Sequence, residues 1–483
     1  MTKPSDPTVV PTERRIYANR TLNLRSIAAI GYDMDYTLIH YRVEHWERQA
    51  YEHIRRHLLG DGWPVENLSF EPDLVTRGLI IDTELGNIVK ANRFGYVMRA
   101  AHGTRPMDFE HQRDQYRHMP IDLADDRFVF LNTLFALSGS CLFAQLVDLY
   151  DDQAFPEIPG YQALFRRVIG HLDQTHVEGT LKSEIMAEPD SFLEIDPEAP
   201  LALLDQLHAG KRLMLISNAE WVYVQRMMSH AYDRWLPGSM TWNDLFEIVI
   251  VGSRKPDFFS SRLPLFSIVD PVRGLLEPEP QGIPGPGWYV GGDATCVERY
   301  LGLSGSEILY VGDHVFADVR MSKSLLRWRT GLILRELENE LASLEAFRPR
   351  EQELAVMMAR KQQLEEQQCG LRLELQRSTL EYGPQPRQDT AEIQRDLATL
   401  KAQIMELDEL IAPIAREAAD VGSPHWGPLL RAGNDKSHLA RQVEASADIY
   451  TSRVSNFLTT TPFAYLRSSR GSMPHDPPVM PLE

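Results

Sequence analysis

The stretch Asp33-Met34-Asp35-Tyr36-Thr37 follows a short apolar run, Ile27-Ala28-Ala29-Ile30, with Gly31-Tyr32 between the two. A β-strand alternates its side chains between two faces, so residues i and i+2 share a face. Asp33 and Asp35 can therefore converge on one ligand at the end of a buried strand. Two close carboxylates repel each other unless a cation or a proton lies between them. The pattern indicates Mg²⁺ and a phosphate, although Asp-x-Asp also occurs in turns, where Asp favours local backbone hydrogen bonds.

Further apolar runs along the chain are typical of strands in a parallel sheet. Buried parallel strands read as near-continuous apolar stretches, and helical patterns lie between several of these runs. The runs are residues 213–216, 246–251, 308–311 and 331–334. Together with 27–32 they predict an α/β fold with a Rossmann-like parallel sheet at its core.

The spacing of the runs predicts several domains. Residues 42–205 separate the first two runs, which is too long for a loop, so we expect an inserted cap or substrate domain with helices near 128–149 and 161–172. The catalytic core then comprises 21–41 and 206–335, and the segment 416–470 is expected to pack on it. A smaller insertion at 260–287 is dense in proline and glycine towards its end, which favours a turn-rich flap.

Residues 336–415 change to a heptad pattern. The apolar seam positions are Leu354, Met357, Leu364, Leu371 and Leu375, then Ile393, Leu397, Leu400, Ile404, Leu407 and Ile411. The helix breaker Gly383-Pro384-Gln385-Pro386 lies between the two sets. The pattern predicts two antiparallel helices that form a coiled-coil hairpin; the alternative is two surface helices packed on the core.

Composition excludes several classes of protein. The 483 residues are 43% hydrophobic and 24% charged, as in ordinary soluble proteins, and the net charge of −18 argues against nonspecific binding to nucleic acid or acidic membranes. Cys141, Cys296 and Cys369 are far apart and odd in number, which argues against a disulfide framework or a zinc site. No apolar run approaches the roughly 20 residues of a membrane span. We therefore expect a cytoplasmic protein with no nucleic-acid or membrane partner.

Polar residues follow three of the other predicted strands. Ligands of open α/β sheets bind beyond the carboxyl ends of the strands, so these residues should meet the opening pair at one edge. They are Ser217-Asn218, Lys255 and Gly312-Asp313-His314, with Asp318 shortly after. Each has a plainer interpretation when taken alone: a turn, a solvated charge, or carboxylates that cap a helix.

The residue types in this set are suited to phosphoryl transfer. An aspartate such as Asp33 can attack phosphorus, and Asp35 can protonate the leaving alcohol and then deprotonate water. The spacing does not decide which aspartate is the nucleophile. Ser217 can donate to a phosphate oxygen, and Lys255 can offset the negative charge.

The same set offers hard oxygen ligands for Mg²⁺. Asp33 and Asp313 supply carboxylates, and the backbone carbonyl of Asp35 adds a further ligand. Asp318 can act directly or through water. We expect these residues to form the metal site.

The four motifs resemble those of the haloacid dehalogenase superfamily of phosphatases. That resemblance implies that Asp33 is the nucleophile and Asp35 the acid/base. More narrowly, the chain is similar to the cytosolic purine 5′-nucleotidase family over segments that span most of its length: 31–38, 82–90, 131–135, 147–148, 254–259, 308–323 and 462–466. This implies Mg²⁺-dependent hydrolysis of purine nucleoside 5′-monophosphates such as inosine and guanosine monophosphate.

The resemblance also implies a substrate pocket in the insertion. The expected substrate-binding residues are Asn132 and Phe135 near the base, then Asp173, His176 and Lys182, with Asn218 from the core. Phe135 is suited to stacking on a purine, although an aromatic residue in a helix is more commonly buried in the core. Ile169 stands where the family has an arginine, which leaves the base preference open.

Other functions stay open at this point. The chain can be a phosphatase or phosphotransferase for another phosphorylated metabolite, or a non-catalytic interaction protein that uses the helical hairpin. We also expect a homo-oligomer.

Overall fold

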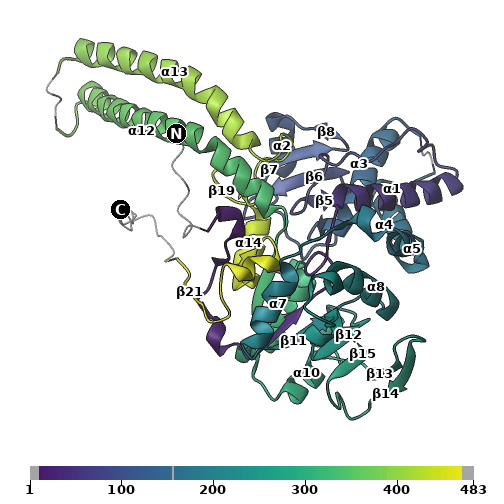
Figure 1. Ribbon diagram of the computed structural model, residues 1–483. Helices are drawn as coiled ribbons and strands as arrows, with labels where there is room; N and C mark the ends of the chain where they lie inside the picture. The colour runs from purple at the N-terminus through teal and green to yellow at the C-terminus, as the bar shows by residue number, and fades with distance from the viewer. Residues whose placement is uncertain (1–9, 155–156, 385, 387, 470–483) are drawn as a thin grey trace, which may run out of the picture. The chain divides into compact units, whose positions relative to one another are not determined.

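The computed structural model describes residues 10–154, 157–384, 386 and 388–469, without the side chains of 176–178. The chain divides into two compact units, Met1–Glu338 with Leu429–Glu483, and Asn339–Pro428. The first unit contains the predicted core and the insertion. The second contains nearly all of the two longest helices, which Figure 1 labels α12 and α13.

A mixed sheet lies at the centre of the first unit. In spatial order its strands are β1 (Tyr17–Ala18), β20 (Ile449–Thr451), β17 (Arg329–Ile333), β16 (Ile308–Gly312), β3 (Ala29–Tyr32), β11 (Arg212–Ile216), β12 (Ile248–Val251), β15 (Gly287–Gly291), β13 (Leu265–Asp270) and β14 (Leu275–Pro278). The five predicted strands are neighbours from β17 to β12, and all of them run parallel. The predicted α/β fold class is therefore confirmed, and the carboxyl ends of these strands share one edge.

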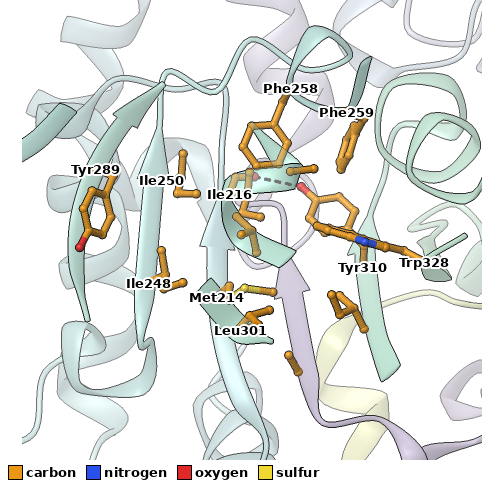
Figure 2. Packing of buried hydrophobic residues seen from close by; sticks show 14 of the residues in the cluster. Met214, Ile216, Ile248, Ile250, Phe258, Phe259, Tyr289, Leu301, Tyr310 and Trp328 are labelled. Carbon is orange, nitrogen blue, oxygen red and sulfur yellow. Dashed lines mark hydrogen bonds between the residues drawn. The ribbon is translucent and has the colours of Figure 1, made fainter. Parts of the chain in front are cut away.

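Aromatic side chains fill one region of the sheet's core, as Figure 2 shows. The Tyr310 ring lies 5.3 Å from that of Phe259, and the Tyr310 hydroxyl donates to the Ile216 carbonyl oxygen at 3.0 Å. A Cβ at Gly31 would lie 2.8 Å from the Tyr310 ring, so β3 passes too close to that ring for any other residue at this position. The glycine before the opening motif thus lets Tyr310 lie directly against β3.

The prediction of a turn-rich flap at 260–287 was wrong for residues 265–278. Residues 265–278, half of the segment, form the antiparallel β13–β14 hairpin, which extends the sheet beyond β15. The residues of β13, Leu265-Phe-Ser-Ile-Val-Asp, include enough apolar and β-branched side chains to form a strand. The run rich in proline and glycine between β14 and β15, on which the prediction rested, is irregular, as are residues 261–264.

The insertion contains helices and a second, antiparallel sheet. The sheet order is β8 (Arg105–Pro106), β7 (Val97–His102), β6 (Asn87–Ala91), β5 (Ile80–Asp82) and β9 (Phe128–Phe130). The helices include α1 (Val43–Gly60), α3 (Leu137–Asp151), α4 (Tyr161–Glu178) and α5 (Thr180–Ala187). The helix predicted at 161–172 is confirmed, but the one at 128–149 was wrong at its start, because Phe128-Val-Phe130 pairs with β5 instead.

The second unit is built from two helices, α12 (Leu337–Leu380) and α13 (Thr390–Asp420). Lys361 pairs with Asp408 at 2.5 Å and Arg350 pairs with Glu417 at 3.2 Å, a register that requires the helices to run antiparallel. The seam residues Leu364, Ile393 and Leu400 are buried. Within the described part of the chain, no helix is long and apolar enough to cross a bilayer.

A buried glutamate in α1 makes the stability of the first unit depend on pH. Glu47 is 0% exposed and accepts a hydrogen bond from the Ser138 N–H at 2.7 Å. Burial raises the pKa of Glu47 to about 8 from its ordinary value of 4.5. The folded state therefore favours the protonated side chain.

The resulting prediction concerns stability between these two pH values. Because the folded-state pKa is the higher one, the protonated side chain stabilises the fold fully below pH 4.5, and this contribution is lost as the pH rises towards 8. The free energy of unfolding should fall by up to about 1.4 kcal/mol per pH unit in this window. Glu47→Gln should remove that part of the slope in urea unfolding measured from pH 5 to 8. Parallel pH profiles for the two proteins would contradict the prediction.

Candidate active site

A buried lysine links the ends of the central strands. The Lys255 ammonium lies 2.7 Å from Asp33 Oδ1 and 2.7 Å from Asp318 Oδ1. It also donates to the Tyr310 hydroxyl at 3.1 Å. The structure therefore brings together three motifs that lie far apart in the sequence.

The turn after β3 sets the positions of the two opening carboxylates. β3 ends at Tyr32, so neither carboxylate belongs to the strand, and strand alternation is not what aligns them. The N–H groups of Leu38 and Ile39 both donate to the Met34 carbonyl oxygen at 2.9 Å. Tyr36 adopts a left-handed backbone with φ of 54°, a sparsely populated conformation for a bulky side chain. A tight turn around Met34 thus places Asp33 and Asp35.

Three aspartates form a carboxylate cluster. Asp33, Asp313 and Asp318 each offer an oxygen within 4.8 Å of the other two, and all three are buried. Asp318 lies in η7 (Val315–Arg320), where its Oδ2 accepts from the His314 N–H at 3.2 Å. A Cβ at Gly312 would lie 2.5 Å from Asp318 Oδ2, so the glycine of this motif allows Asp318 to reach the cluster.

The cluster carries more negative charge than its single lysine balances. Burial raises the pKa of Asp33 to about 7, with Lys255 opposing the rise and Asp318 adding to it. Burial, Asp318 and Asp33 raise the pKa of Asp313 well above its ordinary value. Burial alone would lower the pKa of Lys255, but Asp318 and Asp33 raise it well above its usual range. The lysine is therefore charged, and the cluster favours additional positive charge.

The donor atoms fit a hard divalent cation. Asp313 Oδ2 is buried and has no hydrogen-bond partner among the described residues; Arg77 Nη1 lies 4.0 Å away. A buried carboxylate oxygen in this state needs a cation or a proton. Carboxylate oxygens are the ligands that Mg²⁺ prefers, so Asp33 and Asp313 match the predicted metal site.

Asp35 has a different environment from Asp33. It is half-buried, and its Oδ1 accepts a short hydrogen bond from the Tyr41 hydroxyl. Burial raises the pKa of Asp35, while the Tyr41 hydrogen bond and the charge of Lys182 oppose the rise. The Lys182 ammonium lies 5.7 Å from the centre of the Tyr223 ring. The cap residue Lys182 is thus close enough to act on Asp35.

The two residues after β11 contact the site differently. Ser217 is buried, and its Oγ accepts from the Ala219 N–H at 3.0 Å, which leaves the hydroxyl proton available to donate. Asn218 Nδ2 donates to the Lys255 carbonyl oxygen at 3.0 Å, and its Oδ1 accepts from the Lys255 N–H at 2.6 Å. Asn218 therefore holds the lysine loop in place, and its role in substrate binding stays a prediction.

The remaining predicted substrate residues differ in position. The Phe135 ring lies 4.7 Å from that of Tyr36, which places Phe135 next to the turn that carries Asp35. Asn132 is half-buried between β9 and η3 (Leu134–Ala136), and Asp173 is exposed on α4. In the described part of the chain, neither of these two is among the ion-pair or hydrogen-bond partners of Asp33 and Asp35. The side chain of His176 lies outside the described residues.

Sequence reasoning missed a buried arginine. Arg77 is 1% exposed; its Nη1 donates to the Asp313 carbonyl oxygen at 3.1 Å and its Nη2 to Glu336 at 2.5 Å. It comes from the insertion and holds the backbone of a predicted metal ligand. One signal was available, since Arg77 precedes the apolar run Leu79-Ile80-Ile81 and is followed directly by a glycine.

Comparison with known proteins identifies the family. The sequence profile described as the 5′ nucleotidase family matches residues 16–478, which include every predicted site residue. The chain belongs to the 5′ nucleotidase family. Members of this family are phosphoric monoester hydrolases, and the chain is an enzyme of that class.

Individual relatives agree with the family assignment. This 5′ nucleotidase family member is 26% identical over 491 residues to a 5′-nucleotidase domain-containing protein of Dictyostelium discoideum, covering 97% of this chain and 76% of the relative. It is 27% identical over 363 residues to the human 5′-nucleotidase domain-containing protein 1, covering 68% of this chain and 76% of that one.

A solved structure with some likeness is a haloacid dehalogenase-like family hydrolase from Xanthomonas campestris. It is 12% identical, with a TM-score of 0.25, and the match covers 64% of this chain and 82% of that chain. At this score the likeness adds nothing to the strand order, on which the fold assignment of the 5′ nucleotidase family member rests.

Proposed function

We propose that the chain is a Mg²⁺-dependent 5′-nucleotidase that acts on nucleoside 5′-monophosphates, purine nucleotides above all. The observation that carries the proposal is the Lys255 ammonium placed between Asp33 and Asp318, with Asp313 completing the cluster. The family match supplies the class of reaction. Cytoplasmic location and a homo-oligomeric state stay predictions.

The reaction proceeds in two displacements at phosphorus. In the first, an Asp33 oxygen forms a bond to phosphorus, the bond to the nucleoside 5′-oxygen breaks, and Asp35 gives that oxygen a proton. In the second, water attacks the aspartyl phosphate and loses a proton to Asp35, and the bond between phosphorus and Asp33 breaks. Inorganic phosphate leaves, and both carboxyl groups return to their starting states.

Neighbouring groups stabilise the charge that moves during these steps. Lys255 offsets charge on the phosphate and on Asp33, and Ser217 donates to a phosphate oxygen. Asp33, Asp313 and the Asp35 carbonyl would hold Mg²⁺, with Asp318 acting directly or through water. When bound, Mg²⁺ supplies positive charge that neutralises the phosphate oxygens.

The insertion supplies the contacts to the nucleoside. Phe135 lies beside the Asp35 turn, where an aromatic ring can stack on a base. The Lys182 ammonium lies 5.7 Å from the centre of the Tyr223 ring, and its charge acts to lower the pKa of Asp35, so Lys182 is near enough to the site to contact the substrate. We propose Asn132, Asp173, His176 and Asn218 as further substrate contacts, with Ile169 as a position that influences base preference.

A substrate panel tests the proposal. Because base–aromatic stacking is worth about 1–3 kcal/mol, kcat/KM for inosine monophosphate should exceed that for ribose 5-phosphate by about 5- to 150-fold. Phosphate release should disappear in excess EDTA and return with Mg²⁺. Equal kcat/KM for the two substrates would contradict the nucleotide assignment, and turnover unaffected by EDTA would contradict the metal requirement.

A further inference from the structure

Two buried tyrosines form a hydrogen-bonded chain that ends on Asp35. The Tyr41 hydroxyl donates to Asp35 Oδ1, and the hydroxyl oxygens of Tyr41 and Tyr223 are 3.0 Å apart. The two tyrosines are 2% and 3% exposed. Neither residue is part of the motifs from which the site was predicted.

The two tyrosines come from different, well-anchored elements. Tyr41 ends β4 (His40–Tyr41), which pairs with β10 (Leu193–Glu194) through Tyr41 and Leu193. Tyr223 lies in the first turns of α8 (Trp221–Tyr232), which begins shortly after Ser217. The Tyr41 ring also packs 4.5 Å from that of Trp46 and 5.2 Å from that of Tyr36. The Tyr41 hydroxyl is therefore fixed in position before substrate binds.

The number of hydroxyl protons determines the direction of the hydrogen bonds between Tyr223, Tyr41 and Asp35. A phenol has one proton to donate, and a carboxylate can only accept. When Asp35 is ionised, Tyr41 donates to Asp35, so the Tyr41 oxygen accepts from Tyr223. This arrangement occupies Oδ1 of Asp35 and leaves Oδ2 as the oxygen that can exchange a proton with substrate or water.

We propose that Tyr41, held by Tyr223, is a positioning residue for Asp35. The terminal torsion of an aspartate is broad, so an unrestrained carboxylate would rotate and present either oxygen in many directions. The Tyr41 hydrogen bond fixes this torsion so that Oδ2 faces the leaving oxygen and then the attacking water. This inference rests on the proposed function, because it assigns Asp35 the role of acid/base.

The inference predicts that only the steps with proton transfer depend on Tyr41. Departure of a nucleoside needs a proton from Asp35, whereas 4-nitrophenolate leaves without one. Attack of water on the aspartyl phosphate needs Asp35 with either substrate. With 4-nitrophenyl phosphate, loss of the Tyr41 hydroxyl should slow only the breakdown of the phosphoenzyme.

Stopped-flow release of 4-nitrophenolate by the full chain with Mg²⁺ measures both steps. Tyr41→Phe should give a burst close to one equivalent at the wild-type rate, then a steady-state rate lower by about 10–100-fold, as expected for a displaced catalytic group. Tyr223→Phe should change the steady state in the same direction, but less. A burst and a steady state that fall by the same factor in Tyr41→Phe, or a wild-type steady state, would overturn the inference.

Tyr289→Phe is the matched control. Tyr289 is a buried tyrosine of β15, and its hydroxyl donates to the Gly285 carbonyl oxygen at 2.6 Å rather than to Asp35. It should leave the ratio of burst rate to steady-state rate at the wild-type value; a shifted ratio would overturn the inference. A wild-type enzyme that releases no phosphate from any substrate would instead overturn the proposed function and the inference together.

Discussion

Asp33→Asn is expected to lower phosphate release from nucleoside 5′-monophosphates by more than about 10⁴-fold, the scale seen when a covalent nucleophile is removed. The amide keeps the shape of the side chain but cannot form the aspartyl phosphate. The amide oxygen of the asparagine takes the place of Asp33 Oδ1 beside the Lys255 ammonium, so the geometry of the site should be preserved. Steady-state phosphate release with saturating Mg²⁺ measures the effect.

The melting temperature of Asp33→Asn distinguishes the loss of the nucleophile from unfolding of the protein. Burial raises the pKa of Asp33 to about 7. Above that pH the side chain is charged, and this charge destabilises the metal-free folded protein. The neutral amide should therefore leave the melting temperature at pH 8 unchanged or higher. Asp205→Asn, at an exposed position of α7 (Ala199–His208), is the control and should retain full activity. More than about 1% residual activity in Asp33→Asn would contradict its role as nucleophile.

Lys255→Met should have the largest effect on stability. Removal of the ammonium leaves Asp33 and Asp318 buried without the cation that lies 2.7 Å from each. Breaking a buried ion pair by removal of one partner lowers the free energy of unfolding by about 3–5 kcal/mol. Activity should disappear as well, because no group then offsets the charge of Asp33 against the phosphate. Chemical denaturation and phosphate release together measure the two effects.

Lys211→Met is the matched control for a buried lysine. The Lys211 ammonium is not part of the cluster; it donates to the carbonyl oxygens of Leu24 and Ile27, at 2.7 and 2.6 Å. Its removal should lower stability by about 1–3 kcal/mol, the range for carbonyl groups left without a partner, and leave kcat unchanged. Wild-type stability of Lys255→Met, or loss of kcat in Lys211→Met, would contradict this description of the site.

Local patterns explain which parts of the fold the sequence predicts. The central strands are buried on both faces, so each is a short apolar run, and polar residues of the site follow the ends of these runs within four residues. The parallel order then brings Asp33, Lys255 and Asp313 together without any further information. The flap prediction was wrong for residues 265–278 because it gave more weight to the prolines and glycines near the end of the segment than to the apolar residues of β13 and β14. The start of the helix predicted at 128–149 was wrong because the pairing of β9 with β5 is not visible in the local sequence.

Contacts between distant segments explain what the sequence does not predict. Arg77 reaches Asp313 across 236 positions, and a charge at residue 77 carries no signal of that partner. In the sequence, Tyr41 and Tyr223 cannot be told apart from ordinary aromatic residues of the core. Only the folded turn at Met34 and the start of α8 bring them close to Asp35. These residues orient the reacting carboxylates from distant parts of the chain. Their positions therefore depend on the fold, and no local sequence motif indicates them.

Trapping of the phosphorylated enzyme decides whether Asp33 is the nucleophile. The enzyme is mixed with inosine monophosphate and Mg²⁺, quenched in acid and reduced with borohydride, which converts an aspartyl phosphate to homoserine. Peptide mass spectrometry then locates the reduced residue. We expect homoserine at position 33, and only when substrate is present. Reduction at position 35 or elsewhere, or turnover with no reduced aspartate, would contradict the assignment of Asp33 as the nucleophile.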